Sequence, residues 1–217
     1  MNLNNCHNFE DFRKLAKKKL PSPIFHYIDG GSDDEVTLNR NTTSFNDYDL
    51  VPSVLNDVSN IDMSTTVLGQ KIDFPLFPAA TAMHRLYHHE GERASAKAVE
   101  KMGTIFGTST MGTVSVEEIA KVNKGPKLFQ LYIHKDRGLT DNLLERCKKS
   151  GFSSMCLTVD TVVAGNRERD RRTGFTTPPK LTLGSLLSFA LHPVWTINNL
   201  IHEKFKLANI IHMTEKG

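Results

Sequence analysis

Leu128-Phe129-Gln130-Leu131-Tyr132-Ile133 has the pattern of a strand that is apolar on both faces. A helix is predicted over 141–149, and a second buried strand over 154–159. Strand, helix and strand with short links form a right-handed crossover, which makes the two strands parallel neighbours. The sequence therefore predicts an α/β fold with a parallel sheet.

The predicted helix carries boundary signals as well as periodicity. Thr140 can cap its start, and Gly151 suits the left-handed position just past its end. Apolar residues recur at helical spacing, with charged residues opposite them: Leu139, Leu143, Leu144 and Cys147.

Polar side chains stand late in these strands or just after them. In parallel α/β proteins ligands bind at the carboxyl ends of the strands, so such side chains face a shared site. They are Gln130, Tyr132, Thr158, Asp160 and Arg167. Taken singly, Gln130 and Thr158 are equally well explained as hydrogen-bonded core residues. Taken together, on adjacent strands, they favour a binding site.

Three stretches resemble a known family: Phe129-Gln130-Leu131-Tyr132, Leu157-Thr158-Val159-Asp160-Thr161 and Gly165-Asn166-Arg167-Glu168. They are similar to the FMN-dependent α-hydroxy-acid oxidases and dehydrogenases, the glycolate oxidase and L-lactate dehydrogenase family. Phe25-His26-Tyr27-Ile28-Asp29-Gly30-Gly31 and the segment after Arg167 resemble most the respiratory L-lactate dehydrogenase branch. The resemblance implies the N-terminal half of a (β/α)₈ TIM barrel: about four strand-helix units after an N-terminal helical extension.

Length agrees with a half-barrel, because a complete barrel takes about 250 residues before the family's extension and insertion are added. The chain has 217 residues, and we expect a fragment of a single domain. We predict an extension and lead-in over 1–72, the first four strand-helix units over 73–170, and an insertion over 171–217.

The elements expected before residue 128 are predicted from helix and strand signals. Barrel strands are predicted over 74–83 and 104–110, with an Ala-rich helix between them. Ser115 and Glu118 match the capping box of a further helix. At the N-terminus Asn8 can cap a helix that ends by Pro21. Residues 38–68 are expected to be irregular.

The resemblance implies FMN as the cofactor and assigns residues to it. Ala80, Thr81 and Ala82 would line the flavin, although the family usually has proline where Ala80 stands. The polar edge of the flavin ring would be bonded by hydroxyl and amide groups, which suit an edge with both donors and acceptors: Ser109, Gln130 and Thr158.

The resemblance also implies a small 2-hydroxy acid as substrate, L-lactate first, and places Tyr27, Tyr132 and Arg167 against it. From the residues alone, Tyr27 is more simply a core aromatic, and Arg167 belongs to a charged run that solvent could surround. Electrons would pass from the flavin to a quinone, a cytochrome or dioxygen. Met111 occupies a position where glycolate oxidases often carry tryptophan, which leaves the substrate size open.

No catalytic residue is assigned within this chain. The family's proton-abstracting histidine, a nearby arginine and a lysine come from later strands, so we expect the chain alone to be inactive. Two alternatives remain: a non-enzymatic half-barrel that binds membrane or a partner, and a phosphate-binding barrel without flavin. When complete, the protein is expected to form a homo-oligomer.

Composition limits the partners and the location. The chain is 39% hydrophobic and 24% charged, as in globular domains, and its three cysteines lack C-x-x-C spacing, so neither a disulfide framework nor a metal site is predicted. Neither a signal peptide nor a spanning segment is evident, which favours a cytoplasmic location. No nucleic-acid partner is expected.

The basic excess lies in the last part of the chain, where eight Lys and Arg stand against four Asp and Glu from Gly165 onward. An apolar run with Trp195 and flanking lysines over 173–206 suits a segment at the membrane interface, on the inner face of the cell membrane. A helix pair packed on the barrel is the alternative.

Overall fold

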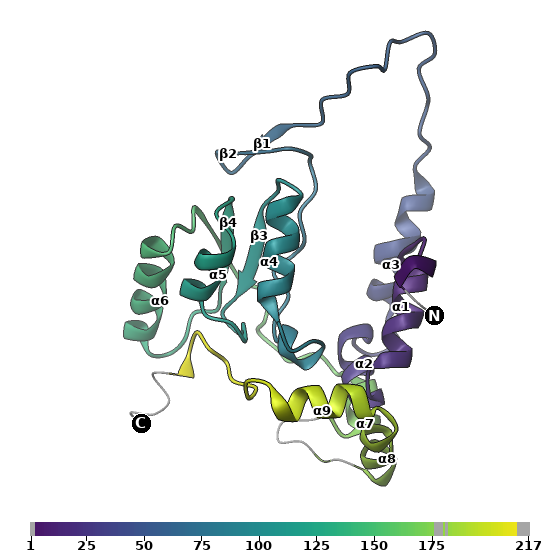
Figure 1. The fold of residues 1–217 in the computed structure, drawn as a ribbon, viewed down its shortest axis with the longest axis vertical. Helices are drawn as coiled ribbons and strands as arrows, with labels where there is room; N and C mark the ends of the chain where they lie inside the picture. Colours follow the sequence, from purple (N-terminus) through teal and green to yellow (C-terminus); the bar gives the residue numbers. More distant parts are fainter. Residues whose placement is uncertain (1–2, 176–179, 181, 212–217) are drawn as a thin grey trace. The chain divides into compact units, whose positions relative to one another are not determined.

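The computed structural model describes residues 3–175, 180 and 182–211 of the chain. It contains two compact units (Figure 1). The helical unit comprises Met1–Asn56 and Val163–Glu203, and the sheet unit comprises Asp57–Val162 and Lys204–Gly217. The predicted division of the sequence into 1–72, 73–170 and 171–217 stays a prediction.

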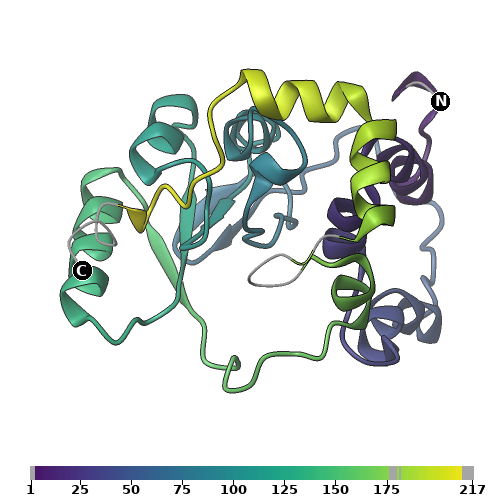
Figure 2. The same cartoon turned by 90° about the horizontal axis from the view of Figure 1, so that it is seen from below.

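The sheet unit is built on three parallel strands in the order β3-β4-β5: β3 (Phe106–Ser109), β4 (Lys127–Leu131) and β5 (Ser154–Leu157). Helix α5 (Val116–Val122) connects the first two strands, and α6 (Arg137–Lys149) connects the second two. The β4-α6-β5 crossover, which can be followed in Figure 2, confirms the predicted parallel pair.

Two apolar clusters form the core of the sheet unit. One joins Phe129 of β4 to the inner face of α6, and the other joins Phe106 of β3 to α4 (Glu92–Lys101) and α5. The half-buried Phe152 packs against both clusters. Burial in the first cluster raises the pKa of the Cys147 thiol to about 12, so this cysteine is a core residue rather than a nucleophile.

The boundaries of α6 differ from the prediction at one end. The helix begins at Arg137, and the Asp136 side chain caps it by accepting a hydrogen bond of 2.9 Å from the Gly138 amide. Thr140, predicted as the cap, is instead buried within the helix. Gly151 lies beyond the other end with a φ of +71°, as predicted.

Strand β5 exists as predicted, but it is not buried. It lies at the edge of the described sheet, and the side chains of Met155 and Leu157 are 49% and 42% exposed. The apolar sequence predicted the strand, whereas its burial depends on what covers the sheet edge.

The predicted first barrel strand over 74–83 is not a strand in the structure. Pro75 and Pro78 have no amide hydrogen to donate to a ladder. The segment still runs beside β3, because the Thr104 hydroxyl donates to the Leu76 carbonyl at 2.6 Å and a Cβ on Gly107 would meet Ala80 at 3.2 Å. Among the described residues the parallel sheet therefore has three strands.

Part of the region expected to be irregular is regular. Helix α3 (Val36–Thr43) and the 3₁₀ turn η2 (Ser44–Asp47) come first, and 48–64 has no regular element. A hairpin of β1 (Thr65–Val67) and β2 (Gln70–Ile72) follows. Its two turn residues, Leu68 and Gly69, both have positive φ, as the type I′ hairpin turn requires.

The helical unit gathers helices from both ends of the sequence. Asn8 caps α1 (Phe9–Lys19) as predicted, with its side chain accepting from the Asp11 amide at 2.9 Å. Helix α2 (Ser22–Asp29) contacts α1 and the later helices α7 (Glu168–Thr173) and α8 (Leu183–Leu191). The remaining elements are α9 (Pro193–Ile201), η1 (Leu3–Asn5) and η3 (His84–Leu86). Within the predicted membrane-interface segment 173–206, residues 176–179 and 181 lie outside the described residues.

Candidate active site

The predicted polar residues of the strands form one hydrogen-bonded row, which we call the strand-end cluster: Ser109, Gln130 and Thr158. Ser109 and Gln130 are partners in the parallel register. The Ser109 hydroxyl donates to Gln130 Oε1 at 2.6 Å, and Gln130 Nε2 donates to Thr158 Oγ1 at 2.5 Å. Three side chains distant in sequence therefore meet at the carboxyl ends of the strands, on the face of the sheet opposite the buried Phe129.

The chemistry of this cluster is neutral and two-sided. Ser109 and Gln130 are buried and Thr158 is half-buried, so their hydrogen bonds are protected from water. After the internal bonds are made, the second amide hydrogen of Gln130 and the Thr158 hydroxyl hydrogen remain as donors, and oxygen lone pairs remain as acceptors. Such a set fits the polar edge of a flavin ring, which offers both donors and acceptors.

The small residues predicted beside the flavin lie in the extended segment that runs along β3. Ala80 approaches Gly107 of β3, while Thr81 is exposed and its hydroxyl donates to the Ala79 carbonyl at 3.4 Å. Ala82 is half-buried. Small side chains leave room here for a flat ligand to approach the backbone.

Tyr132 follows β4 and is held through its backbone. Its amide donates to Thr110 Oγ1 at 3.1 Å, and the Thr110 hydroxyl donates to the Gln130 carbonyl at 2.8 Å. Tyr132 is thereby fixed two residues beyond Gln130, at the same end of the sheet.

The other two predicted substrate residues meet in the helical unit, where we define the ionic cluster as Tyr27, Arg167 and Asp170. The Arg167 guanidinium donates through Nη2 to the Tyr27 carbonyl, and its carbon lies 5.1 Å from the centre of the Tyr27 ring. Asp170 accepts from Arg167 Nε at 2.5 Å. The Phe175 ring also packs against the Tyr27 ring, with 4.8 Å between the ring centroids. Arg167 is therefore a half-buried, paired residue rather than a fully solvated one.

Charge dominates this second cluster. Asp170 is buried, and its Oδ1 has no hydrogen-bond partner in the structure. Burial and then the nearby Arg169 charge lower the pKa of His26, the neighbour of Tyr27. A fixed, partly buried guanidinium beside a tyrosine is suited to a carboxylate ligand.

Two buried residues that support the sheet unit were not found from the sequence. Glu92, the first residue of α4, is fully buried and accepts from the Thr113 amide at 2.8 Å and the Thr113 hydroxyl at 2.5 Å. Asn209 binds the loop after β3, donating to the Ser109 carbonyl at 3.2 Å and accepting from the Val116 amide at 3.1 Å. Neither residue lies in a pattern that distinguishes it from a surface polar residue.

Metal ligands are not grouped anywhere in the described part of the chain, where no three histidine, cysteine or acidic side chains converge.

The model of the family described as FMN-dependent dehydrogenase matches residues 16–216, nearly the whole chain. This chain belongs to the FMN-dependent dehydrogenase family. FMN is the cofactor on which the family's enzymes depend, so the predictions of family and cofactor are confirmed. The strand-end cluster supplies donors and acceptors that fit a flavin edge, independently of the match.

Relatives within the FMN-dependent dehydrogenase family include glycolate oxidase from Spinacia oleracea, 43% identical over 81% of this chain and 48% of its own length. L-lactate dehydrogenase from Vibrio parahaemolyticus is 39% identical over 92% of this chain and 53% of its own length. The chain thus spans about half the length of the curated relatives it matches.

Among solved structures, the monotopic membrane protein (S)-mandelate dehydrogenase superposes with a TM-score of 0.88 at 33% identity, covering 97% of this chain and 56% of that one. The prediction of an N-terminal half-barrel is confirmed by this superposition, although one predicted strand is not formed.

Proposed function

We propose that this chain supplies the N-terminal half of an enzyme that oxidises an L-2-hydroxy acid to the 2-oxo acid with FMN. The observation that carries the proposal is the strand-end cluster, in which hydroxyl, amide and hydroxyl groups from three parallel strands form one row. This is the chemistry expected for holding a flavin edge without adding charge to it.

Residues of the sheet unit would bind and orient the cofactor. Ser109, Gln130 and Thr158 would hydrogen-bond the polar edge of the ring, and the backbone at Ala80, Thr81 and Ala82 would approach its flat face. FMN, when bound, accepts the two electrons that the substrate loses. The protein's task is to place the substrate carbon next to the ring.

Residues Tyr27, Tyr132 and Arg167 would hold the substrate. The guanidinium of Arg167 pairs with a carboxylate, and its contacts with Tyr27 and Asp170 restrict its motion. Tyr132 would contact the substrate hydroxyl. The chain supplies no proton acceptor in this proposal, so we expect the 217-residue chain alone not to turn over substrate.

L-lactate is the proposed substrate, since the alignment with a lactate dehydrogenase extends over more of the chain than that with a glycolate oxidase. A quinone, a cytochrome or dioxygen is the proposed acceptor, and the complete protein is proposed to be a homo-oligomer.

The test is made on a fused enzyme, in which residues 1–217 are joined to the C-terminal half of the Vibrio L-lactate dehydrogenase. Anaerobic reduction of its flavin is followed with L-lactate, glycolate and (S)-mandelate in turn. The proposal predicts bound FMN and fastest reduction by L-lactate. Absence of FMN, or its reduction by none of the three acids, would contradict it.

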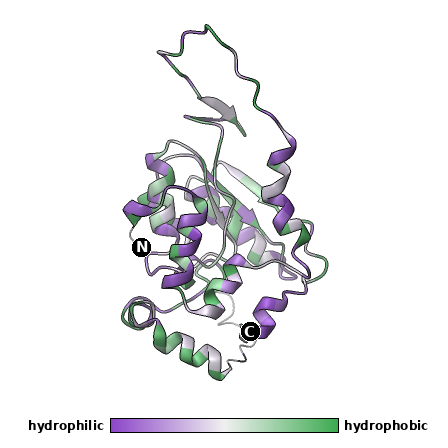
Figure 3. Ribbon diagram, turned by 90° about the vertical axis from the view of Figure 1, so that its right-hand side faces the viewer, coloured by the Kyte–Doolittle hydropathy of each residue, from purple (hydrophilic) through white to green (hydrophobic). Residues whose placement is uncertain are grey.

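A second function, attachment to a membrane surface, is favoured by the exposed apolar side chains of α8 and α9. Leu183, Val194 and Leu200 are 86%, 75% and 78% exposed, and Figure 3 shows green, hydrophobic residues along these helices together with hydrophilic ones. None of the helices among the described residues has the length and hydrophobicity needed to cross a bilayer. We propose that the two helices lie in the interface on the inner face of the cell membrane.

Liposome flotation tests this attachment. Replacing Leu183, Leu187 and Val194 by serine is expected to abolish flotation of the chain. The matched control replaces Val54, Leu55 and Val58, which are also exposed, and should float like the wild type. Equal loss in both triple variants, or no loss in the first, would remove the proposal.

The alternative is a non-enzymatic role for the half-barrel. It would be favoured if the chain binds liposomes but the flavin of the fused enzyme is not reduced by any of the three acids.

A further inference from the structure

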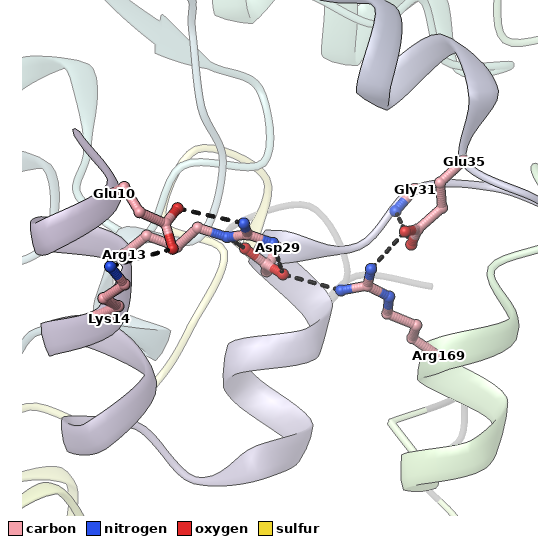
Figure 4. A network of polar contacts seen from close by, with 7 residues as sticks. All are labelled: Glu10, Arg13, Lys14, Asp29, Gly31, Glu35 and Arg169. Atoms are coloured by element: carbon pink, nitrogen blue, oxygen red, sulfur yellow. Dashed lines mark hydrogen bonds and ion pairs between the residues drawn. The ribbon is translucent and has the colours of Figure 1, made fainter. Parts of the chain in front are cut away.

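The carboxylate of Asp29, at the end of α2, lies between two guanidinium groups (Figure 4). Arg13 of α1 donates to it through Nε at 2.5 Å and through Nη2 at 2.9 Å. Arg169 of α7 donates to Oδ2 through Nη1 at 2.8 Å. The hydrogen bond from Arg13 is the main cause of a lowered pKa at Asp29, which keeps this residue ionised.

Arg169 makes a second contact that closes the loop after α2. Its Nη2 donates to Glu35 Oε2, and Glu35 Oε1 accepts from the Gly31 amide at 2.9 Å. The Arg169 stem also lies close to the backbone, because a Cβ on Gly30 would meet its Cδ at 3.0 Å. We call Asp29, Glu35 and Arg169 the clamp.

The clamp lies two residues from the ionic cluster on both of the helices involved. Asp29 follows Tyr27 by two residues on α2, and Arg169 follows Arg167 by two residues at the start of α7. Side chains two residues apart on a helix point in different directions. The pairs Tyr27–Arg167 and Asp29–Arg169 therefore join α2 to α7 at two separate points, and two points fix a rotation that one point leaves free.

We propose that Asp29 and Arg169 are positioning residues, which hold α2 and α7 so that Tyr27 and Arg167 face each other as the receptor for a substrate carboxylate. The receptor role of the Tyr27–Arg167 pair rests on the proposed function. The positioning role rests on the contacts alone. Neither clamp residue touches the substrate in this proposal.

Arg13 provides a matched control within the same network. It pairs with the same Asp29 carboxylate in two hydrogen bonds, but it belongs to α1, which carries neither Tyr27 nor Arg167. Replacement of either arginine by glutamine removes one of the two positive charges that pair with the Asp29 carboxylate. A role confined to stability would make the two replacements alike, whereas positioning makes only the Arg169 replacement disturb the Tyr27–Arg167 pair.

The experiment is NMR of the 217-residue chain, with the Tyr27 ring assigned by Tyr27→Phe and the Arg167 side chain by Arg167→Met. We expect the cross-peaks between the Tyr27 ring and the Arg167 side chain to be lost in Arg169→Gln and retained in Arg13→Gln. Arg169→Lys, which keeps the charge but not the two-pronged geometry, should weaken them only partially. Retention of the other side-chain cross-peaks of α2 and α7 in Arg169→Gln would show that the loss is not due to unfolding. Retention in Arg169→Gln, or equal loss in Arg13→Gln, overturns the proposal.

Pyruvate, the 2-oxo acid formed from L-lactate, is the probe for the receptor role. Its dissociation constant at the Arg167 signals should rise about tenfold in Arg169→Gln and stay within about twofold of the wild type in Arg13→Gln. Equal dissociation constants in the two variants contradict the positioning role. If wild-type chain shows no pyruvate binding, the substrate part of the proposed function fails, and the cross-peaks still decide the clamp.

Discussion

The strand-end cluster and the ionic cluster, proposed to bind the flavin and the substrate, differ in their chemistry. Ser109, Gln130 and Thr158 are neutral, and each bond between them joins a hydroxyl and an amide on neighbouring strands. Tyr27 and Arg167 are held instead by a carboxylate and by a ring contact between two helices. A neutral row can hold a ring with donors and acceptors, whereas a paired guanidinium recognises a negative charge.

The two clusters are held in place by different means. Register in a parallel sheet places Ser109 and Gln130 side by side without help from other side chains. Two helices distant in sequence have no such register, and the helical unit uses the clamp around Asp29 in its place.

The largest effect is expected from the packing beneath the strand-end cluster. Phe129→Ala should lower the free energy of unfolding by about 3–5 kcal/mol, because Phe129 is buried in the core next to Gln130. Urea denaturation measures the loss, and Phe9→Ala, at a residue 94% exposed, should change it by about 0.5 kcal/mol or less. Similar losses of unfolding free energy in the two variants would contradict the assignment of Phe129 to the core and of Phe9 to the surface.

The neutral cluster can be broken at its central residue. Gln130→Leu keeps the side-chain volume but leaves the Ser109 hydroxyl without its acceptor and Thr158 without its donor. FMN should bind the fused enzyme about 10- to 100-fold more weakly, from the loss of about 1.5–3 kcal/mol of hydrogen bonding. Flavin fluorescence titration measures the affinity, with Gln70→Leu on the hairpin as control. Unchanged affinity would remove Gln130 from the flavin site.

The ionic cluster can be broken without touching the neutral one. Arg167→Met in the fused enzyme should weaken pyruvate binding about tenfold or more, because a charge-assisted pair is lost, and should leave FMN affinity unchanged. Arg167→Lys should recover part of the loss. Comparable weakening of FMN by this replacement would mean that the two clusters do not have separate tasks.

The smallest effect is expected from an ion pair. It lies in the sheet unit, the same unit as the neutral strand-end cluster. Arg146 bonds both oxygens of Glu117, at 2.7 and 2.9 Å, and lowers the Glu117 pKa from 4.5 to about 2. A lowered acid pKa stabilises the fold above pH 4.5, and this stabilisation disappears as the pH falls toward 2.

Glu117→Gln should reduce that acid-dependent part of the stability by about 1 kcal/mol or less, since the carboxylate is partly exposed. Urea midpoints at neutral pH and near pH 3 measure it. Wild type and variant should differ most at neutral pH, and the opposite order would contradict the assigned cause.

The sequence predicted the parallel strands because their apolar runs and the helix between them are local signals. The positions of Gln130 and Thr158 late in adjacent parallel strands also predicted that they lie together, whereas Ser109 was assigned to the same site by the family resemblance. The missing first strand was predictable in part, because Pro75 and Pro78 already weaken a ladder.

Other features depend on tertiary contacts that leave no local pattern. The pairing of Tyr27 with Arg167 joins residues 140 positions apart and was suggested only by family resemblance. The buried Glu92 looked like an ordinary helix-start acid. In the sequence, the residues of the clamp cannot be distinguished from charged surface residues. Only the structure places Asp29 between Arg13 and Arg169.

The proposed roles of the two clusters, flavin binding by one and substrate binding by the other, can be separated in a single experiment. The flavin absorbance of the fused enzyme carrying Arg167→Met is recorded before and after anaerobic addition of L-lactate. A full complement of FMN is expected, together with bleaching about tenfold or more slower than in the unsubstituted fused enzyme at the same sub-saturating L-lactate concentration. Bleaching at the unsubstituted rate, or loss of FMN before L-lactate is added, would contradict these roles.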